Sequence, residues 1–149
     1  MKALITKLVS SDAGIAALVL RVHVGLTLAA HGAQKLFAWF GGYGLDGTGQ
    51  YMASLGLEPG FLMALLAGSA EFFGGLALAL GLLTRPAAAV SAFTMLIAIF
   101  SAHIQNGLFL SNGGYEYALV LFAVTVSLAI TGAGRLAVDN VIARALTTK

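Results

Sequence analysis

The 149-residue chain contains no cysteine, only two prolines and few charged residues. The absence of cysteine excludes disulfides, Cys-ligated zinc and Cys-held iron–sulfur clusters within this chain, so any thiol chemistry must lie on a partner. Charged residues make up 9% of the chain and hydrophobic residues 59%, whereas about a quarter of a soluble domain is charged. So few charges cannot cover a water-soluble surface, and we expect lipid to be the solvent for much of this one.

The basic residues are dispersed, which argues against nucleic acid as a partner. The net charge is +2, but no basic run is present, and a run is what nucleic-acid binding favours. Near the N-terminus, Arg21 interrupts the apolar stretch and no small-residue cleavage site follows, so we expect no removable signal peptide. The length predicts a single domain over residues 1–149.

Four long apolar segments are present, over residues 13–40, 60–83, 86–105 and 115–131. Each approaches the roughly 20 residues that a helix needs to span the hydrocarbon core. We expect short amphipathic segments before and after the spans, over residues 1–12 and 135–149. The sequence therefore predicts an all-α integral membrane protein, a four-helix bundle with short amphipathic terminal segments.

The connection after the first span is rich in glycine. Residues 41–49 are expected to form a flexible rim, and residues 50–57 a short interfacial helix. Residues 42–47 match G-x-G-x-x-G, but a membrane helix rather than a strand precedes them, so we interpret the match as chance. Four aromatic residues at this level indicate an interfacial belt: Phe37, Trp39, Phe40 and Tyr43.

The placement of basic residues predicts the orientation. With four spans, six of them fall on one side of the membrane: Lys2, Lys7, Arg85, Arg135, Arg144 and Lys149. The other two connections carry no Lys or Arg. By the positive-inside rule, both termini are expected to be cytoplasmic.

The first span carries an unusual set of basic groups, namely Arg21, His23, His31 and Lys35. At about 100° per residue, Lys35, His31 and His23 lie roughly 40°, 80° and 160° from Arg21. All four therefore share one half of the helix. Ionisable groups at membrane depth are costly, so this half is expected to face partners, water or a ligand.

Outside the first span, the membrane segments contain three ionisable residues, Glu71, His103 and Glu116. Counting about 1.5 Å per residue from the membrane edges places Arg21 and Glu71 close to one level. We expect these two to form an ion pair, because either charge alone would be expensive in lipid. Four further groups are expected in the outer third, around a polar pocket that is floored by this pair and opens outward: His31, Lys35, His103 and Glu116.

Other interpretations of these residues stay open. The Arg21–Glu71 pair can serve mainly as a structural clamp, and Lys35 and Glu116 can simply extend to the interface. His23 is expected to bond the backbone of a neighbouring helix. Gly68, Gly74 and Gly75 would allow close helix approach.

The histidines raise two further kinds of site, a haem site and a non-haem metal site. A haem b would need two axial histidines on facing helices, and His31 and His103 meet the depth requirement only roughly. These two histidines with Glu71 or Glu116 could also form a non-haem metal site. Two histidines at one depth also arise by chance, and we expect neither haem nor metal.

Several motifs together resemble the DoxX family of bacterial membrane proteins, and the match covers nearly the whole chain. They are Arg21-x3-Gly25-x5-His31-Gly32-x2-Lys35, Ala70-Glu71-x2-Gly74-Gly75, Gly81-Leu82-x-Thr84-Arg85-Pro86, His103 and Asn112-Gly113-Gly114-x-Glu116-Tyr117. The resemblance implies a four-helix protein of the inner membrane. It also implies a setting in quinone-linked redox chemistry, thiol handling or oxidative stress, with partner proteins.

The sequence thus favours a redox-linked membrane subunit that binds a quinone-like molecule. His31 and Lys35 could donate to the quinone, Glu71 and His103 could carry protons, and Arg21 could keep Glu71 ionised. A partner oxidoreductase would deliver the electrons, and association with further chains is also expected. The alternatives are a carrier for a small anion or hydrophobic acid, and a scaffold that recruits a soluble redox enzyme through residues 135–149.

Overall fold

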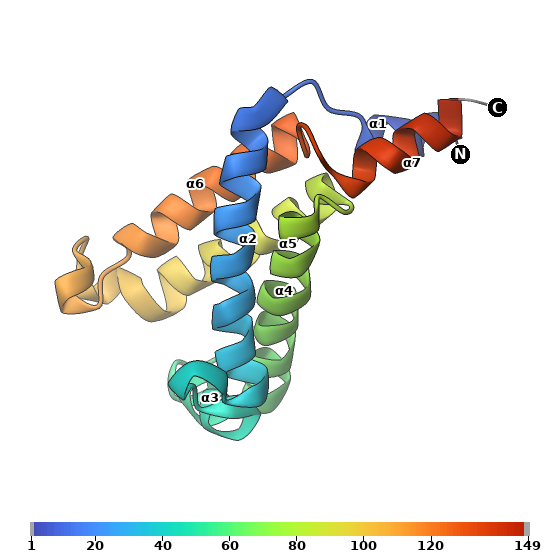
Figure 1. Cartoon of the computed structure of the whole chain (residues 1–149). Helices are drawn as coiled ribbons and strands as arrows, with labels where there is room; N and C mark the ends of the chain where they lie inside the picture. The colour runs from blue at the N-terminus through green and yellow to red at the C-terminus, as the bar shows by residue number, and fades with distance from the viewer. Residues whose placement is uncertain (1, 148–149) are drawn as a thin grey trace.

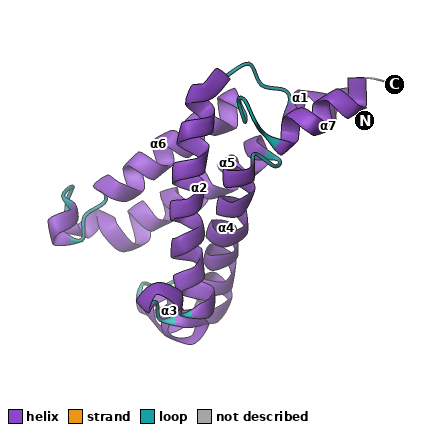
Figure 2. Cartoon of the chain, in the orientation of Figure 1, coloured by secondary structure: helices purple, strands orange, loops and turns teal. Residues whose placement is uncertain are grey.

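The computed structural model describes residues 2–147, and every regular element among them is helical. Four helices form the body of the molecule: α2 (Gly14–Phe37), α4 (Gly60–Leu80), α5 (Thr84–Ala98) and α6 (Glu116–Thr131). Three shorter helices accompany them, α1 (Lys2–Val9), α3 (Gly44–Ser54) and α7 (Val138–Thr147) (Figure 1). The predicted all-α, four-helix architecture is confirmed, and only short loops separate the helices (Figure 2).

Within the described residues 2–147, three helices are long and apolar enough to cross a membrane. They are α2, α4 and the continuous helical stretch of residues 84–106, in which α5 continues through a π-helical segment, Ile99–His103, and a 3-10 turn, Ile104–Asn106. The fourth, α6, has 16 residues, which corresponds to about 24 Å. When α5 is counted together with its continuation to residue 106, α6 is the shortest of the four apolar stretches, as expected. Further 3-10 turns lie at Trp39–Gly41 and Leu110–Asn112.

Helices α2 and α4 run side by side, and their backbones touch (Figure 1). A Cβ atom added to Gly75 would lie 2.5 Å from the amide nitrogen of Ala29, and one on Gly25 would lie 2.6 Å from the carbonyl oxygen of Gly75. Only glycine permits this approach. The prediction for Gly68 and Gly75 is confirmed, whereas Gly74 faces α5, with its nearest atom on Ser91.

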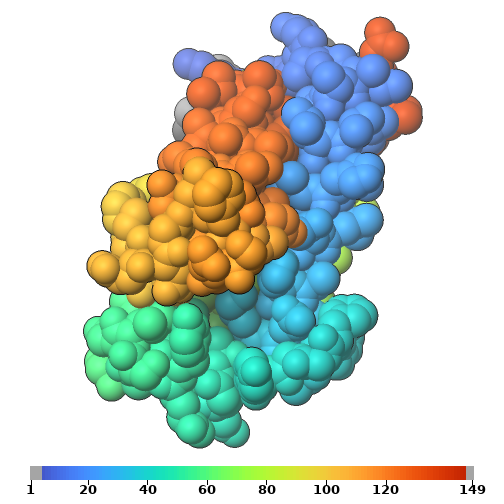
Figure 3. All heavy atoms as spheres, turned by 90° about the vertical axis from the view of Figure 1, so that its left-hand side faces the viewer, coloured from blue at the N-terminus to red at the C-terminus, as the bar shows by residue number. Residues whose placement is uncertain are grey.

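Helices α5 and α6 form a hairpin that diverges from α2 and α4 (Figure 1). A buried apolar cluster joins the two pairs where they meet, and it includes Leu28, Leu78, Met95, Leu121 and Leu128. Farther along, the end of α5 and the start of α6 stand over α3 and the start of α4, with a hollow between them (Figure 3). The divergence of the hairpin therefore creates space inside the molecule.

Helix α3 begins earlier than the sequence predicts. Residues 44–49, expected to belong to a flexible rim, form the first half of a helix that ends at Ser54, and the helix expected at 50–57 is displaced accordingly. The glycines serve packing here, because a Cβ atom on Gly49 would lie 3.1 Å from the Cα of Phe61 at the start of α4. Glycine allows α3 to lie directly on α4.

Two arginines hold together the end of the molecule that carries both termini. Arg21 donates to carbonyl oxygens at the end of α4 and in the segment that follows α6: those of Leu78, Ala79, Ala133, Arg135 and Leu136. Arg85 donates to carbonyls at the end of α6 and to that of Ser10. Asp139 accepts hydrogen bonds from the amides of Leu83 and Thr84, where α5 begins.

Candidate functional site

A cavity of about 730 Å³ lies between α2, α3, α4, α5 and α6. Its walls are mostly apolar and include Leu28, Leu66, Phe93, Met95, Ile97 and Leu121. Polar side chains line it at a few positions, His31, Lys35, Glu71, Thr94, Ser101 and His103. The volume and the sparse polar groups are typical of a site for a small organic ligand.

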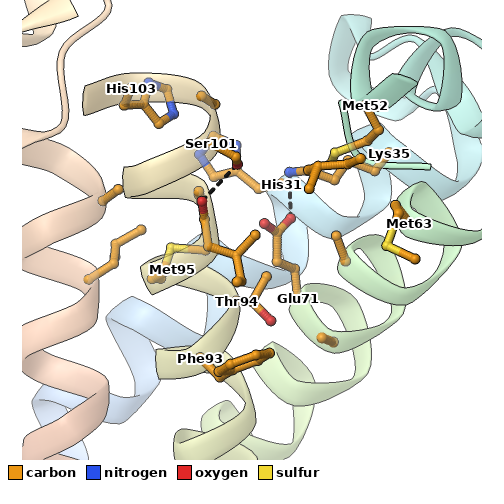
Figure 4. Close-up of a pocket in the computed structure, with 18 of the residues that line it drawn as sticks. His31, Lys35, Met52, Met63, Glu71, Phe93, Thr94, Met95, Ser101 and His103 are labelled. Atoms are coloured by element: carbon orange, nitrogen blue, oxygen red, sulfur yellow. Dashed lines mark hydrogen bonds and ion pairs between the residues drawn. The ribbon is translucent and has the colours of Figure 1, made fainter. Parts of the chain in front are cut away.

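The most polar part of the cavity is an ion pair between α2 and α4. Lys35 Nζ lies 2.5 Å from Glu71 Oε2, and the two side chains are 24% and 5% exposed. His31 lies one helical turn before Lys35 and lines the same cavity, and its ring centroid is 6.0 Å from that of Tyr117 on α6. Figure 4 shows His31, Lys35 and Glu71 gathered at the centre. The structure thus brings three of the predicted residues together.

His103 lines the cavity from the π-helical segment of α5, apart from this cluster (Figure 4). Its Nδ1 lies 2.8 Å from the carbonyl oxygen of Gly113. If Nδ1 carries the proton, it donates to that carbonyl and leaves Nε2 as an acceptor. Single π turns of this kind occur often at functional sites.

The predicted pair between Arg21 and Glu71 is wrong. Arg21 does not line the cavity, and it donates to the carbonyls of Leu78 and Ala79 at the end of α4. These carbonyls lie about 10–12 Å along α4 from Glu71 at 1.5 Å per residue. The error arises because α2 extends beyond the end of α4, so a depth counted from the start of α2 places Arg21 too far into the membrane. Lys35, one helical turn after His31, takes the carboxylate instead.

Two other predicted roles also change in the structure. Glu116 lies outside the cavity lining, and its Oε1 accepts a hydrogen bond from the amide of Leu110 at 2.6 Å. The ring of His23 lies 3.2 Å from the carbonyl of Val19 in its own helix, not in a neighbouring one. The carboxylate of Glu116 therefore orders the loop before α6, and His23 stands apart from the cavity.

The cavity opens sideways, between α4 and α5. Lining residues on these two helices are strongly exposed: Leu66 at 55%, Val90 at 51% and Phe93 at 65%. In a membrane helix, exposed apolar side chains of this kind face the lipid tails. The opening on this side therefore faces the lipid tails.

A second hollow of about 520 Å³ lies at the end of α2. We call it the end pocket. It is lined by α2, α3 and the turn between them, through Gln34, Lys35, Gly41, Gly42, Tyr43, Gly47, Thr48 and Tyr51. Lys35 and Tyr51 line both the end pocket and the cavity.

Sequence reasoning missed the contributions of α3 and α5. Thr94 and Ser101 are seven residues apart, so they share one face of α5, and this spacing in an apolar helix could have identified them. Their hydroxyls donate to the carbonyls of Val90 and Ile97 in the same helix. Tyr51 lies in residues 50–57, where a short interfacial helix was expected, but no pattern in the sequence indicated that this helix lines the cavity.

The described part of the chain contains no group of three His, Asp or Glu residues placed to hold a metal ion. His31 and Glu71 line the same cavity, and Lys35 binds the Glu71 carboxylate. An ammonium at this position neutralises the carboxylate that a metal would need as a ligand.

Comparison with known proteins gives one family and several relatives. The DoxX family model matches residues 16–104. The chain is 34% identical over 125 residues to "Putative oxidoreductase CatD" of Bacillus subtilis, which covers 84% of this chain and 85% of that protein. It is 36% identical over 105 residues to "Inner membrane protein YqjF" of Escherichia coli, covering 66% and 75%, and 31% identical over 131 residues to "Inner membrane protein YphA" of the same organism, covering 83% and 87%. No solved structure matches significantly.

Proposed function

Since this chain belongs to the DoxX family of inner-membrane proteins, we propose that it is a redox-linked membrane subunit that binds a quinone-like molecule in its cavity. The observation that carries the proposal is the half-buried Lys35 paired with the buried Glu71, which line, together with His31, an otherwise apolar cavity that opens between α4 and α5. The name of the relative CatD supports a redox role.

The shape of the cavity suits a molecule with a polar head and an apolar body. Lipid-soluble ligands can enter between Leu66 and Phe93, which flank the opening. At the centre of the cavity, His31, Lys35 and Glu71 present donors and an acceptor that would orient a polar head. A quinone combines these features, with two carbonyl oxygens on a ring and an isoprenoid tail.

Reduction of a quinone requires two electrons and two protons, and this chain is suited to supply the protons. The Lys35 ammonium and the His31 ring are placed to donate hydrogen bonds to a carbonyl oxygen. The Glu71 carboxylate and the His103 ring can each accept a proton and pass it on to the bound molecule. The electron pair is assigned to a partner oxidoreductase that carries its own two-electron donor.

The proposal requires His31 and Glu71 for binding, and this can be measured. Purified protein should retain an isoprenoid quinone detectable by mass spectrometry of co-extracted lipids. His31→Ala and Glu71→Gln should each lower binding of decylubiquinone about tenfold, which is what 1.4 kcal/mol of lost contact corresponds to. His23→Ala is the matched control, because His23 lies outside the cavity.

Unchanged binding in both cavity variants would contradict the proposal. A Soret band in the purified protein would instead indicate haem. Flux of a hydrophobic acid through proteoliposomes that contain no redox partner would favour the carrier alternative.

A further inference from the structure

The ion pair lies where the two hollows meet. The cavity, on one side, opens between apolar side chains such as Leu66 and Phe93. The end pocket, on the other, is lined by Gln34, Lys35, Thr48, two tyrosines and three glycines. Lys35 borders both hollows and its Nζ lies 2.5 Å from Glu71 Oε2, so this side chain links the end pocket to the pair.

The end pocket lies at the level of an aromatic cluster. The ring of Trp39 stands 5.1 Å from that of Phe37, and Trp39 and Phe40 are 54% and 73% exposed. Exposed aromatic residues of membrane proteins concentrate at the boundary between hydrocarbon and water. Tyr43, which lines the end pocket, is 85% exposed. This hollow therefore lies at the level of that boundary, at the end of the molecule opposite the two termini (Figure 1).

The backbone around the end pocket is held in an unusual conformation. Ala38 and Phe40 adopt left-handed conformations, with φ of 58° and 52°, and such residues cost on the order of 1–3 kcal/mol each. The Gln34 amide donates to the carbonyl of Phe40 at 3.2 Å. A Cβ atom on Gly42 would collide with the backbone of Gln34. These contacts fold the turn back over α2 and fix the wall of the hollow.

We propose that the end pocket is an aqueous vestibule through which water and protons reach the Lys35–Glu71 pair from the side of the membrane opposite the termini. The use of these protons rests on the function proposed above. A volume of about 520 Å³ holds several water molecules, since each occupies about 30 Å³ in the liquid. Thr48, which is 7% exposed, and Gln34 line the route with groups that can bond to water.

The proton balance explains why such a route is needed. A quinone that enters from lipid brings no protons, and its conversion to the quinol takes two from the protein together with two electrons from the partner. Glu71 is almost completely buried, so it must be replenished through a neighbour that contacts water. The other titratable groups that line the cavity around the pair are His31 on α2, Tyr51 on α3, His103 beyond α5 and Tyr117 on α6. Of these, only Tyr51 also lines the end pocket.

The natural absence of cysteine makes the route directly measurable. Lys35→Cys places a single thiol where the two hollows meet, and a membrane-impermeant cationic thiosulfonate serves as the probe. In intact cells the thiol should react with reagent added outside. A second substitution that fills the end pocket, Thr48→Trp, should slow the reaction about tenfold or more, because thiol reactivity depends on access. A matched bulky residue in the cavity, Ala67→Trp, should leave the rate unchanged.

Because Lys35→Cys leaves Glu71 unpaired and can disturb folding, Gln34→Cys provides a second position on the vestibule wall with the ion pair intact. Leu76→Cys, on the exposed face of α4, is the unreactive control. An unreactive thiol at both vestibule positions overturns the proposal. So does a rate at the Lys35→Cys thiol that falls with Ala67→Trp rather than Thr48→Trp.

The proton role has its own readout. In membranes that contain the partner, a bulky label on Thr48→Cys should lower kcat for decylubiquinone reduction and leave KM unchanged. Full labelling with undiminished kcat overturns the proton role. Labelling through the end pocket in a protein that binds no quinone refutes the proposed function and leaves the vestibule intact, so the two failures are distinguishable.

Discussion

Replacing Arg21 with methionine tests the role that the structure gives this residue. Arg21 is 1% exposed and donates to five backbone carbonyls, which belong to the end of α4 and to the segment that follows α6. Arg21→Met keeps most of the side-chain volume and removes every donor. It therefore breaks the connection between these two segments without opening a large cavity.

The expected loss of stability follows from the burial of the five acceptors. The hydrogen bonds to Ala133 and Leu78 are buried, and the other three are partly exposed, so water can replace the donor there. An unsatisfied buried acceptor costs about 1–3 kcal/mol. Arg21→Met should therefore lower the free energy of unfolding by roughly 2–6 kcal/mol, a large part of the roughly 5–15 kcal/mol of a typical domain.

Unfolding in mixed micelles, followed by circular dichroism at 222 nm, measures this loss. Arg135→Met is the matched control, because the Arg135 side chain is exposed, and it should change stability by less than about 0.5 kcal/mol. Arg21→Lys should lie between the two, since an ammonium has three donors in place of five. If Arg21→Met is as stable as its control, the structural role of Arg21 is refuted. If Arg21→Lys folds but loses decylubiquinone, the separation of Arg21 from the cavity is refuted.

Three further outcomes are expected. Lys35→Met should destabilise the protein by about 3–5 kcal/mol because it leaves Glu71 buried and unpaired. The double variant Lys35→Met/Glu71→Leu should recover part of the lost stability. Strict additivity of the two substitutions in unfolding measurements would argue against coupling between Lys35 and Glu71. Gly75→Ala should lower the free energy of unfolding by about 1–3 kcal/mol because it forces α2 away from α4. Gly74→Ala should be tolerated because its nearest neighbour is the movable hydroxyl of Ser91. Equal melting temperatures for the two variants would contradict the close packing of α2 on α4. Ala70→Phe should fill the cavity and weaken decylubiquinone binding about tenfold with little change in melting temperature, and undiminished affinity would place the ligand elsewhere.

The scaffold alternative needs a different experiment from the one that the sequence indicates. The sequence alone directs attention to truncation of residues 135–149. In the structure the described part of this segment, residues 135–147, is tied to the body helices, because Asp139 accepts hydrogen bonds from the amides of Leu83 and Thr84. Truncation would therefore disturb α5 itself. Substitution of exposed residues on α7, such as Val141, tests recruitment of a partner without this effect.

Apolar length and loop composition were sufficient to predict the four body helices. The predicted ends differ from the observed ends by a few residues, as for the first span, predicted over 13–40 and observed over 14–37. Hydrocarbon requires each spanning segment to satisfy its own backbone hydrogen bonds, so composition alone identifies helices in this class of protein. The predicted cytoplasmic location of both termini stays a prediction.

The relative register of the helices could not be read from the sequence. Glycine positions showed where backbones could approach, but they did not reveal that α2 extends past the end of α4. That offset decides which basic group meets Glu71. Three of the predicted residues, His31, Lys35 and Glu71, gather nonetheless, because they lie on the faces where α2 and α4 meet. The packing of α3 against its neighbours could not be predicted either. It depends on glycines, and a glycine-rich stretch in a single sequence is typical of a loop.

Photolabelling tests the central claim most directly. An azido derivative of decylubiquinone, activated in native membranes and mapped by mass spectrometry, should label the cavity walls on α4 and α5, near Glu71 and Thr94. Excess decylubiquinone should suppress this labelling, and Glu71→Gln should reduce it. Labelling spread over the lipid-facing surfaces, insensitive to competitor and to the substitution, would contradict the account.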